Sequence, residues 1–353
     1  MNFDKVPFKA NPNFRFKTLF SSNRDCLASN CNFEVVKSKK DGKIYVISPY
    51  FNEDDDEQKN LIQVLSLEDG NVVKELEGHE DRVLNVRYFC NKATQKEYLV
   101  SADRKYKVIV WDITDDYKLL KKTDFKYEGF IYSSALVFRE DSIFLITSSI
   151  NNQGTVKIVD VTKNEGPKDI ASTKDFSVYY MEPWHNKKNG KDYLILCGKS
   201  KIKIIELFHG GPEQVTKEFN TNEKQPYSLG GLIYNYDGRE FFITLSTFGG
   251  VLKIDLETME QVGELQTFDE CNFYNPIQWN EKYLLFIDSF QKRIIVMDLR
   301  DNKIKSKMVF PELDCPRYMK KVIHPVYGES LLVVTIECQM NLYTTRRITS
   351  FKE

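Results

Sequence analysis

The sequence lacks the cysteine and histidine patterns that hold metal ions or build disulfide frameworks. Its seven cysteines are scattered, odd in number and never arranged as Cys-x-x-Cys, and its four histidines are isolated from one another. Such cysteine usage is typical of reduced thiols inside the cell, in the cytoplasm or the nucleus. We therefore expect an intracellular protein with no metal site and no cofactor.

A large net charge and a long apolar segment are also missing. The 50 basic and 51 acidic residues give a formal net charge of −1, so no global field favours binding to nucleic acid. The longest apolar runs have the length of single strands, too short to span a bilayer. Residues 1–14 contain two prolines, one aspartate and two lysines, which does not resemble a signal peptide.

Common catalytic motifs do not occur either. The sequence contains no Gly-x-Ser-x-Gly elbow, no Walker-type phosphate loop and no His-Glu-x-x-His pair. It also has no apolar stripe of useful length with a period of 3.6 residues, so we expect almost no helix. These absences argue against the commonest hydrolases and nucleotide-dependent enzymes.

What the sequence does contain is an internal repeat. A β-branched segment ends in an acidic residue between two apolar ones, as in residues 108–113 and 156–161. Counting weaker copies at both ends, the acidic position falls at residues 66, 112, 160, 206, 255, 298 and 344. The spacing is 43 to 49 residues, and seven copies fill the chain. Periods of roughly 40–50 residues are typical of β-propellers.

Each repeat contains four strand-like segments, and the second is an unbroken apolar run, as in residues 143–146. Such a run suits a strand that is buried on both faces. The sequence therefore predicts an all-β fold: a seven-bladed β-propeller with four-stranded antiparallel blades. The last repeat lacks a fourth strand, and we expect the N-terminal segment 15–20 to supply it and close the ring.

This interpretation gives one domain. We expect an extended N-terminal arm at residues 1–14, a single propeller at 15–348 and a C-terminal tail at 349–353. The third strands of the blades are expected near residues 61–67, 107–113, 155–161, 201–207, 250–256, 293–299 and 340–345.

One repeat carries a fuller motif, whose members are Gly78, His79, Ser101, Trp111 and Asp112. This motif resembles the WD repeat of β-propeller proteins. In that family the histidine, a strand serine or threonine, an aspartate and the tryptophan form a buried hydrogen-bond chain. The resemblance implies structural roles for His79, Ser101, Trp111 and Asp112. Lys105 stands at the family's aspartate position and Asp103 falls about two residues earlier, so a complete set of four is not predicted.

The resemblance implies a non-catalytic scaffold that binds protein partners as a subunit of a larger assembly. Binding is expected around the central channel, on the face that carries the fourth-to-first and second-to-third strand loops. Two alternatives from other classes stay open: a hydrolase with a site in the channel, and a phosphoinositide-binding propeller. The second group carries a Phe-Arg-Arg-Gly motif, and the closest segment here, 345–348, lacks both the Phe and the Gly.

The candidate partner-binding residues are of two kinds. An acidic run in the longest loop of that face would attract a basic segment of a partner, unless it is simply a solvated loop. The run consists of Glu53, Asp54, Asp55, Asp56 and Glu57. Aromatic rings near the start of first strands are either core residues or a collar of anchors at the channel mouth. With a basic residue of the same face, this second set is Arg82, Tyr132, Tyr179, Tyr227, Phe273 and Tyr318.

Overall fold

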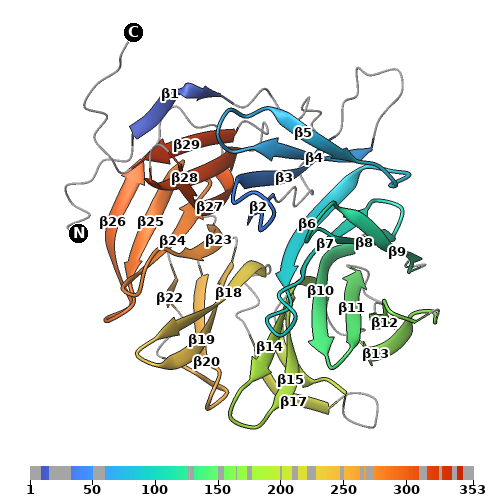
Figure 1. The fold of residues 1–353 in the computed structure, drawn as a ribbon. Coiled ribbons are helices and arrows are strands. Elements are labelled where there is room, and N and C mark those ends of the chain that lie inside the picture. The colour runs from blue at the N-terminus through green and yellow to red at the C-terminus, as the bar shows by residue number, and fades with distance from the viewer. Residues whose placement is uncertain are drawn as a thin grey trace.

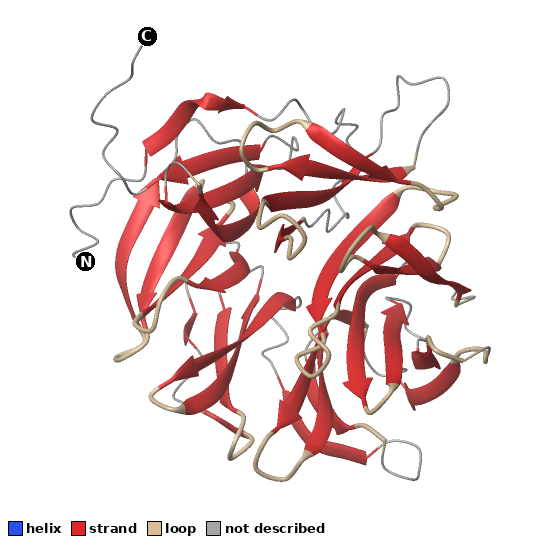
Figure 2. Ribbon diagram, viewed as in Figure 1, coloured by secondary structure: helices blue, strands red, loops and turns tan. Residues whose placement is uncertain are grey.

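Seven antiparallel sheets surround a common axis, and every described element is a strand (Figures 1 and 2). The predicted seven-bladed β-propeller is therefore confirmed. No helix in the described part of the chain is long and apolar enough to cross a membrane. The computed structural model describes residues 9–15, 33–50, 60–125, 127, 131–149, 155–163, 165–172, 177–198, 201–208, 214–220, 228–246, 250–262, 266–267, 273–309, 316–325, 328–335 and 340–344.

Within a blade the strands follow one another from the axis outward (Figure 1). Blade 1 consists of β2 (Glu34–Lys37), β3 (Ile44–Tyr50), β4 (Leu61–Ser66) and β5 (Val72–Leu76). Blade 2 consists of β6 (Val83–Cys90), β7 (Glu97–Asp103), β8 (Lys107–Asp112) and β9 (Lys118–Asp124). Blade 3 consists of β10 (Ile131–Arg139), β11 (Ser142–Ser149), β12 (Thr155–Asp160) and β13 (Lys168–Ser172). Blade 4 consists of β14 (Val178–Asn186), β15 (Lys191–Gly198), β16 (Lys201–Glu206) and β17 (Gln214–Asn220). Blade 5 consists of β18 (Ser228–Tyr236), β19 (Arg239–Ser246), β20 (Gly250–Asp255), β21 (Glu260–Gln261) and β22 (Gln266–Thr267). Blade 6 consists of β23 (Phe273–Gln278), β24 (Tyr283–Asp288), β25 (Arg293–Asp298) and β26 (Lys303–Val309). Blade 7 consists of β27 (Pro316–His324), β28 (Gly328–Thr335), β29 (Met340–Thr344) and β1 (Lys9–Arg15).

Apolar side chains fill the space between neighbouring blades. Every residue of β7 is buried, as expected for a second strand enclosed between two other sheets. Between blades 1 and 2, Ile47 and Val64 pack in one cluster with Leu99 and Trp111. Burial of each such side chain stabilises the fold by roughly 1.5–3 kcal/mol, so packing between blades holds the ring together.

The acidic residue of the repeat closes the turn between the third and fourth strands. Asp112, Asp160, Asp255 and Asp298 each accept a hydrogen bond from the backbone N–H two residues later, at 2.9–3.0 Å. An aspartate that bonds its own backbone in this way stabilises a tight turn. In these four blades the acidic residue of the sequence repeat therefore marks the turn between the third and fourth strands.

The ring closes through an N-terminal strand, as the sequence predicts, but at a different place. β1 pairs with β29 in antiparallel register, with Lys9 opposite Thr344 and Ala10 opposite Tyr343. The closing strand is thus Lys9–Arg15 and not 15–20, and the expected arm at 1–14 contains it; residues 16–20 lie outside the described residues. Strand propensity favours the more apolar segment 15–20. An outer strand, however, forms hydrogen bonds on one side only and tolerates Pro12, which has no N–H.

Closure through β1 predicts a specific truncation effect. Removal of residues 1–15 should expose the edge of β29, lower the melting temperature by several degrees and reduce solubility, because an unpaired edge strand invites aggregation. Removal of residues 1–8 keeps β1 and serves as the matched control, with little expected change. Thermal melts of the two truncated proteins give the answer. Equal melting temperatures for the full chain and the 1–15 deletion would contradict this account of closure.

Candidate functional site

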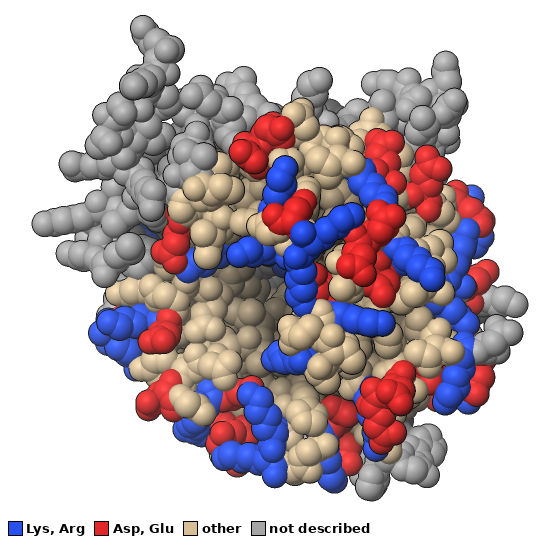
Figure 3. All heavy atoms as spheres, in the orientation of Figure 1, with Lys and Arg blue, Asp and Glu red and all other residues tan. Residues whose placement is uncertain are grey.

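The first strands of the seven blades surround the axis of the ring. Each first strand contacts the next, from β2 and β6 through β10, β14, β18 and β23 to β27, which returns to β2. Figure 3 shows a hollow near the middle of the molecule, with mainly uncharged residues inside it and Lys and Arg side chains along its edge. This central channel is where the fold brings together side chains from distant parts of the sequence.

A cavity of about 490 Å³ occupies the channel. All seven blades contribute to its wall, which includes Glu34, Arg87, Ser133, Tyr180, Gly231, Ile277 and Lys320. The volume is in the range of sites that hold a small molecule or a few side chains of a peptide. A closed ring therefore builds one site from segments spread over almost the whole chain.

The strand period explains which side chains reach this cavity. Successive side chains of a strand point to opposite faces, so residues two apart share the channel face. The pairs that do so are Asn85 and Arg87, Tyr180 and Glu182, and Tyr318 and Lys320. Between such residues lie core side chains, of which Met181 and Met319 are fully buried.

A bulge near the start of several first strands shifts this pattern by one residue. In blade 4 Tyr179 is the extra residue between Val178 and Tyr180, and blade 7 has the same shift between Pro316 and Tyr318. A bulge re-aims the side chains that follow it. Tyr180, and not Tyr179, therefore holds the position in its blade that Tyr318 holds in blade 7.

Arg87 is the central cross-link of the channel. Its guanidinium donates from Nη1 to the carbonyl oxygens of Ser134 at 2.8 Å and Met181 at 2.7 Å. From Nη2 it donates to Oε2 of Glu182 at 2.8 Å, and it lies 5.3 Å from the centre of the Tyr180 ring. One side chain of blade 2 thus binds both blade 3 and blade 4. The planar guanidinium suits this role because it presents several donors in a fixed geometry.

The pKa values of Arg87 and Tyr180 are shifted by burial and by neighbouring residues of the cavity wall. Burial, the largest single effect, would lower the pKa of Arg87. Electrostatic interactions with Glu182, Tyr180 and Glu34, together with the hydrogen bond to Glu182, outweigh burial and raise that pKa. Burial, and then the charge of Glu182, hold the pKa of Tyr180 well above its usual value. The protonated Tyr180 hydroxyl donates a hydrogen bond to Glu182. Glu182 is therefore a charged acceptor with two donors, which favours a fixed structural role.

A second ion pair crosses the seam of the ring. Nζ of Lys320 in blade 7 lies 2.9 Å from Oε2 of Glu34 in blade 1. The seam is thus joined at the channel as well as at the outer strand. The cavity therefore contains two acids and two bases in matched pairs.

Of the aromatic residues predicted to bind a partner, the structure places two in the wall of the cavity. Tyr179 and Tyr318 are half-buried and line the cavity, and Tyr318 also packs against the core between blades 7 and 1. Tyr132 and Phe273 belong to β10 and β23, with side chains outside the described part. Tyr227 lies outside the described residues, as do Glu53, Asp54, Asp55, Asp56 and Glu57.

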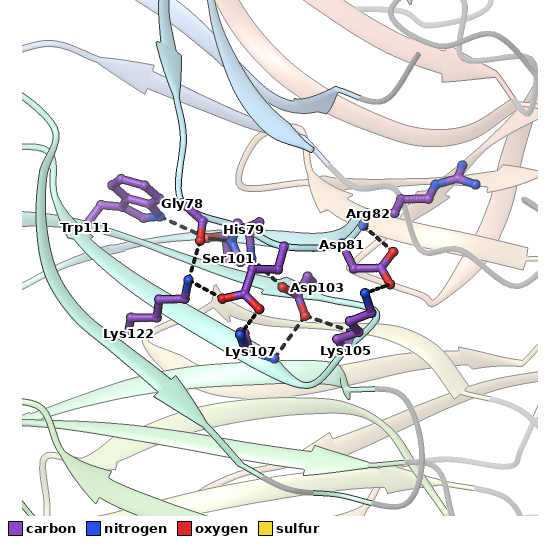
Figure 4. Close-up of polar contacts among 11 residues, drawn as sticks. Gly78, His79, Asp81, Arg82, Ser101, Asp103, Lys105, Lys107, Trp111 and Lys122 are labelled. Carbon is purple, nitrogen blue, oxygen red and sulfur yellow. Dashed lines mark hydrogen bonds and ion pairs between the residues drawn. The ribbon is translucent and has the colours of Figure 1, made fainter. Parts of the chain in front are cut away.

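Blade 2 contains a buried polar chain (Figure 4). Nε1 of Trp111 donates to Oγ of Ser101 at 2.9 Å, and Oγ of Ser101 lies 2.7 Å from Nε2 of His79. Nδ1 of His79 lies 3.0 Å from Oδ2 of Asp103. With the ring proton on Nδ1, His79 donates to Asp103 and accepts from Ser101, so each group is satisfied. A complete buried chain of this kind makes the packing specific.

Asp103 is the fourth member that the sequence did not predict. The chain turns immediately after β7, so Oδ1 of Asp103 also accepts from the backbone N–H groups of Lys105 at 2.9 Å and Lys107 at 3.0 Å. The Lys105 side chain, at the family's usual aspartate position, is exposed and pairs with Asp81 at 3.6 Å. The Arg82 side chain points away from this cluster (Figure 4).

The loop before β6 is held close to the polar chain. Gly78 has φ of +143°, and a Cβ there would lie 3.2 Å from a methyl group of Ile109, so glycine fits this position. Nζ of Lys122 donates to the Gly78 carbonyl at 2.8 Å and to Glu80 at 2.9 Å. Hydrogen bonds from Lys107, and then from Lys122, lower the pKa of Glu80 to about 2. These contacts fix the loop on the rim of blade 2.

Sequence reasoning missed the charged side chains of the channel. Arg87, Glu182, Glu34 and Lys320 stand in different repeats, and nothing in the linear sequence pairs them. A usable signal was present, because Asn85 and Arg87 interrupt an otherwise apolar first strand on its channel-facing side. The choice of partner depends on the three-dimensional ring.

The polar chain of blade 2 predicts unequal effects for two neighbouring substitutions. Asp103→Ala should lower the free energy of unfolding by about 1–3 kcal/mol, because it leaves the buried His79 and two backbone N–H groups without their acceptor. Lys105→Ala removes only an exposed pair and should change it by less than about 0.5 kcal/mol. Urea unfolding of both variants measures the difference. Equal stabilities would refute the role assigned to Asp103.

No family model matches the sequence, and no curated protein matches it. Among solved structures, the chain is similar to the β-propeller domain of Cps50 (Swd1) from Myceliophteria thermophila, at 12% identity and a TM-score of 0.63. That match covers 90% of this chain and 96% of the other. The chain is also similar to BBS1N, solved in complex with ARL6DN, at 12% identity and a TM-score of 0.65, covering 98% and 99%. At this identity the likeness establishes the fold alone.

Proposed function

We propose that this protein is a non-catalytic scaffold that binds a protein partner at the mouth of the central channel. The observation that carries the proposal is the cavity of about 490 Å³ to which all seven blades contribute. Half-buried tyrosines of its wall, including Tyr179 and Tyr318, are rigid amphipathic anchors of the kind that dominate protein-binding sites. The binding face is the one that carries the fourth-to-first and second-to-third strand loops.

The chemistry of the described cavity residues supports binding over catalysis. Arg87 and Glu182 are paired, as are Lys320 and Glu34. Oγ of Ser133 accepts the backbone N–H of Met181 at 2.9 Å. A serine that acts as a nucleophile in acyl transfer needs a base within hydrogen-bond reach, whereas the partner of Ser133 is a backbone N–H donor. No group of three or more His, Cys, Asp or Glu side chains among the described residues is arranged to hold a metal ion.

A similar structure supports the partner class. BBS1N, which shares the fold with this chain, was solved in complex with the protein ARL6DN. A ring of this shape therefore carries a protein ligand in at least one case. We propose the same class of partner for this chain, and a place as a subunit of an assembly inside the cell.

The acidic run suggests a further property of that partner. Glu53, Asp54, Asp55, Asp56 and Glu57 add five negative charges to one loop of the proposed binding face. Such a cluster raises the encounter rate with a segment rich in Lys and Arg. We propose that the partner presents a basic segment to this loop, while the channel tyrosines supply most of the affinity.

The scaffold proposal predicts a separable role for Tyr179. Proteins that co-purify with the tagged full-length chain give the partner, and Tyr179→Ala should weaken that partner's affinity by about tenfold or more. The melting temperature should change little, because Tyr179 is the extra residue of a bulge and is half-buried. Tyr236→Ala, which removes a half-buried tyrosine of blade 5 away from the cavity wall, is the matched control. Loss of the fold without a specific loss of binding would make Tyr179 a core residue.

The acidic run predicts a salt effect on association. Replacement of all five residues by the corresponding amides should slow association with the partner and flatten its dependence on salt, because rim charges act over about 8 Å at physiological salt. The melting temperature should stay the same. Stopped-flow or surface-binding kinetics at several salt concentrations measure the effect. An unchanged association rate would remove the basic segment from the proposal and leave the scaffold role standing.

A further inference from the structure

A second cavity lies at the opposite end of the channel, towards the loops that join first and second strands. Its volume is about 640 Å³, and its wall includes Phe89, Ala93, Leu136, Phe138, Trp184 and Ile233. These six residues define what we call the blade 3 groove. Glu182 lines both this groove and the channel cavity, so the two spaces meet at one side chain.

Differences in loop length create the groove. Only Glu140 and Asp141 join β10 to β11 in blade 3, whereas residues 91–96 join β6 to β7 and residues 187–190 join β14 to β15. The short turn holds Glu140 at φ of +50°, a left-handed conformation that non-glycine residues adopt rarely. Blade 3 is therefore low between two higher neighbours, and the ends of its strands stay uncovered by a loop.

The wall of the groove is apolar and fixed by its own contacts. Trp184 stacks on Tyr193 with ring centres 5.0 Å apart, and its Nε1 donates to Glu240 at 2.9 Å. Phe89 and Leu136 are buried in the core between blades 2, 3 and 4. A preformed apolar cleft with a few oriented polar groups is typical of a ligand site.

The acidic side chains of the groove are already engaged. Glu182 binds Arg87, Asp192 lies 2.8 Å from Nδ1 of His185, and Glu240 accepts from Trp184. The lysines of the wall are Lys92 and Lys187, of which Lys187 forms an ion pair with Glu240.

Two lysines provide these positive charges on opposite sides of the groove. Lys92 is exposed in the blade 2 loop, and no carboxylate of the described residues forms an ion pair with it. Nζ of Lys187 in the blade 4 loop forms an ion pair of 3.6 Å with Oε1 of Glu240, and the Lys187 side chain stays 76% exposed. Negative charges on a ligand would therefore face a lysine on each side of the apolar cleft.

We propose that the blade 3 groove binds a short acidic segment of a second partner protein, with an apolar or aromatic anchor flanked by Asp or Glu. The anchor fits the cleft between Phe138 and Trp184, and its flanking carboxylates face Lys92 and Lys187. This site is distinct from the proposed partner site at the other channel mouth, which favours a basic segment. The scaffold would then join two partners of opposite charge, one on each face of the ring.

Selection from a random peptide library on the immobilised full-length protein tests this inference. We expect enriched peptides with an apolar or aromatic residue between acidic ones. Their affinity should fall about tenfold when Lys92→Glu and Lys187→Glu are combined, because two attractions become repulsions. Ala93→Trp, in an exposed loop position on the groove wall, should block the cleft and abolish binding with the melting temperature unchanged.

The matched control combines Lys282→Glu with Lys217→Glu, two exposed lysines away from the groove, and should leave peptide affinity unchanged. Three results would overturn the inference: enrichment of basic peptides, failure to enrich any peptide, or equal peptide affinity for the wild type and the groove variants. None of these results bears on the other channel mouth, where the Tyr179→Ala variant reports separately.

Discussion

Closure of the ring is the constraint on which the other features depend. Blade 7 must meet blade 1 across a separation of 286 residues between Lys320 and Glu34, and bringing such distant segments together costs chain entropy. Three layers of contact offset this cost: the β1–β29 pairing outside, an apolar cluster that joins Phe33 to Leu332 in the middle, and the Lys320–Glu34 pair at the channel. The β1–β29 pairing completes the sheet of blade 7, and the other two contacts join blade 7 to blade 1.

The closed ring then determines the chemistry of its centre. First strands are held at fixed positions, so Arg87 can bind the backbone of two other blades and still pair with Glu182. Because the charged side chains of the cavity are paired with one another, the wall presents a defined shape and aromatic surface and little net charge. The exposed charges of Lys92 and Lys187 lie instead in loops between first and second strands.

The periodic part of the structure could be predicted from the sequence, because one chemical device recurs. Asp112 and Asp160 mark a turn that recurs in four blades, and the apolar second strands mark burial between blades. Features that break the period could not be predicted. The bulge at Tyr179 and the early turn that brings Asp103 to His79 each shift a side chain by one or two positions. The closing strand contains Pro12, which strand propensity disfavours and an edge position accepts.

Loop length is the feature of this fold that can vary most freely. The hydrogen-bonded blades and the packing between them leave little freedom to the strands, whereas a hairpin of two residues or of six is compatible with the same sheet. Blade 3 has a two-residue turn at Glu140 even though this requires an unfavourable φ, and the neighbouring loops are longer. The resulting groove is apolar inside and carries Lys92 and Lys187 at its sides. The lengths of such loops can thus change without any change in the contacts that close the ring.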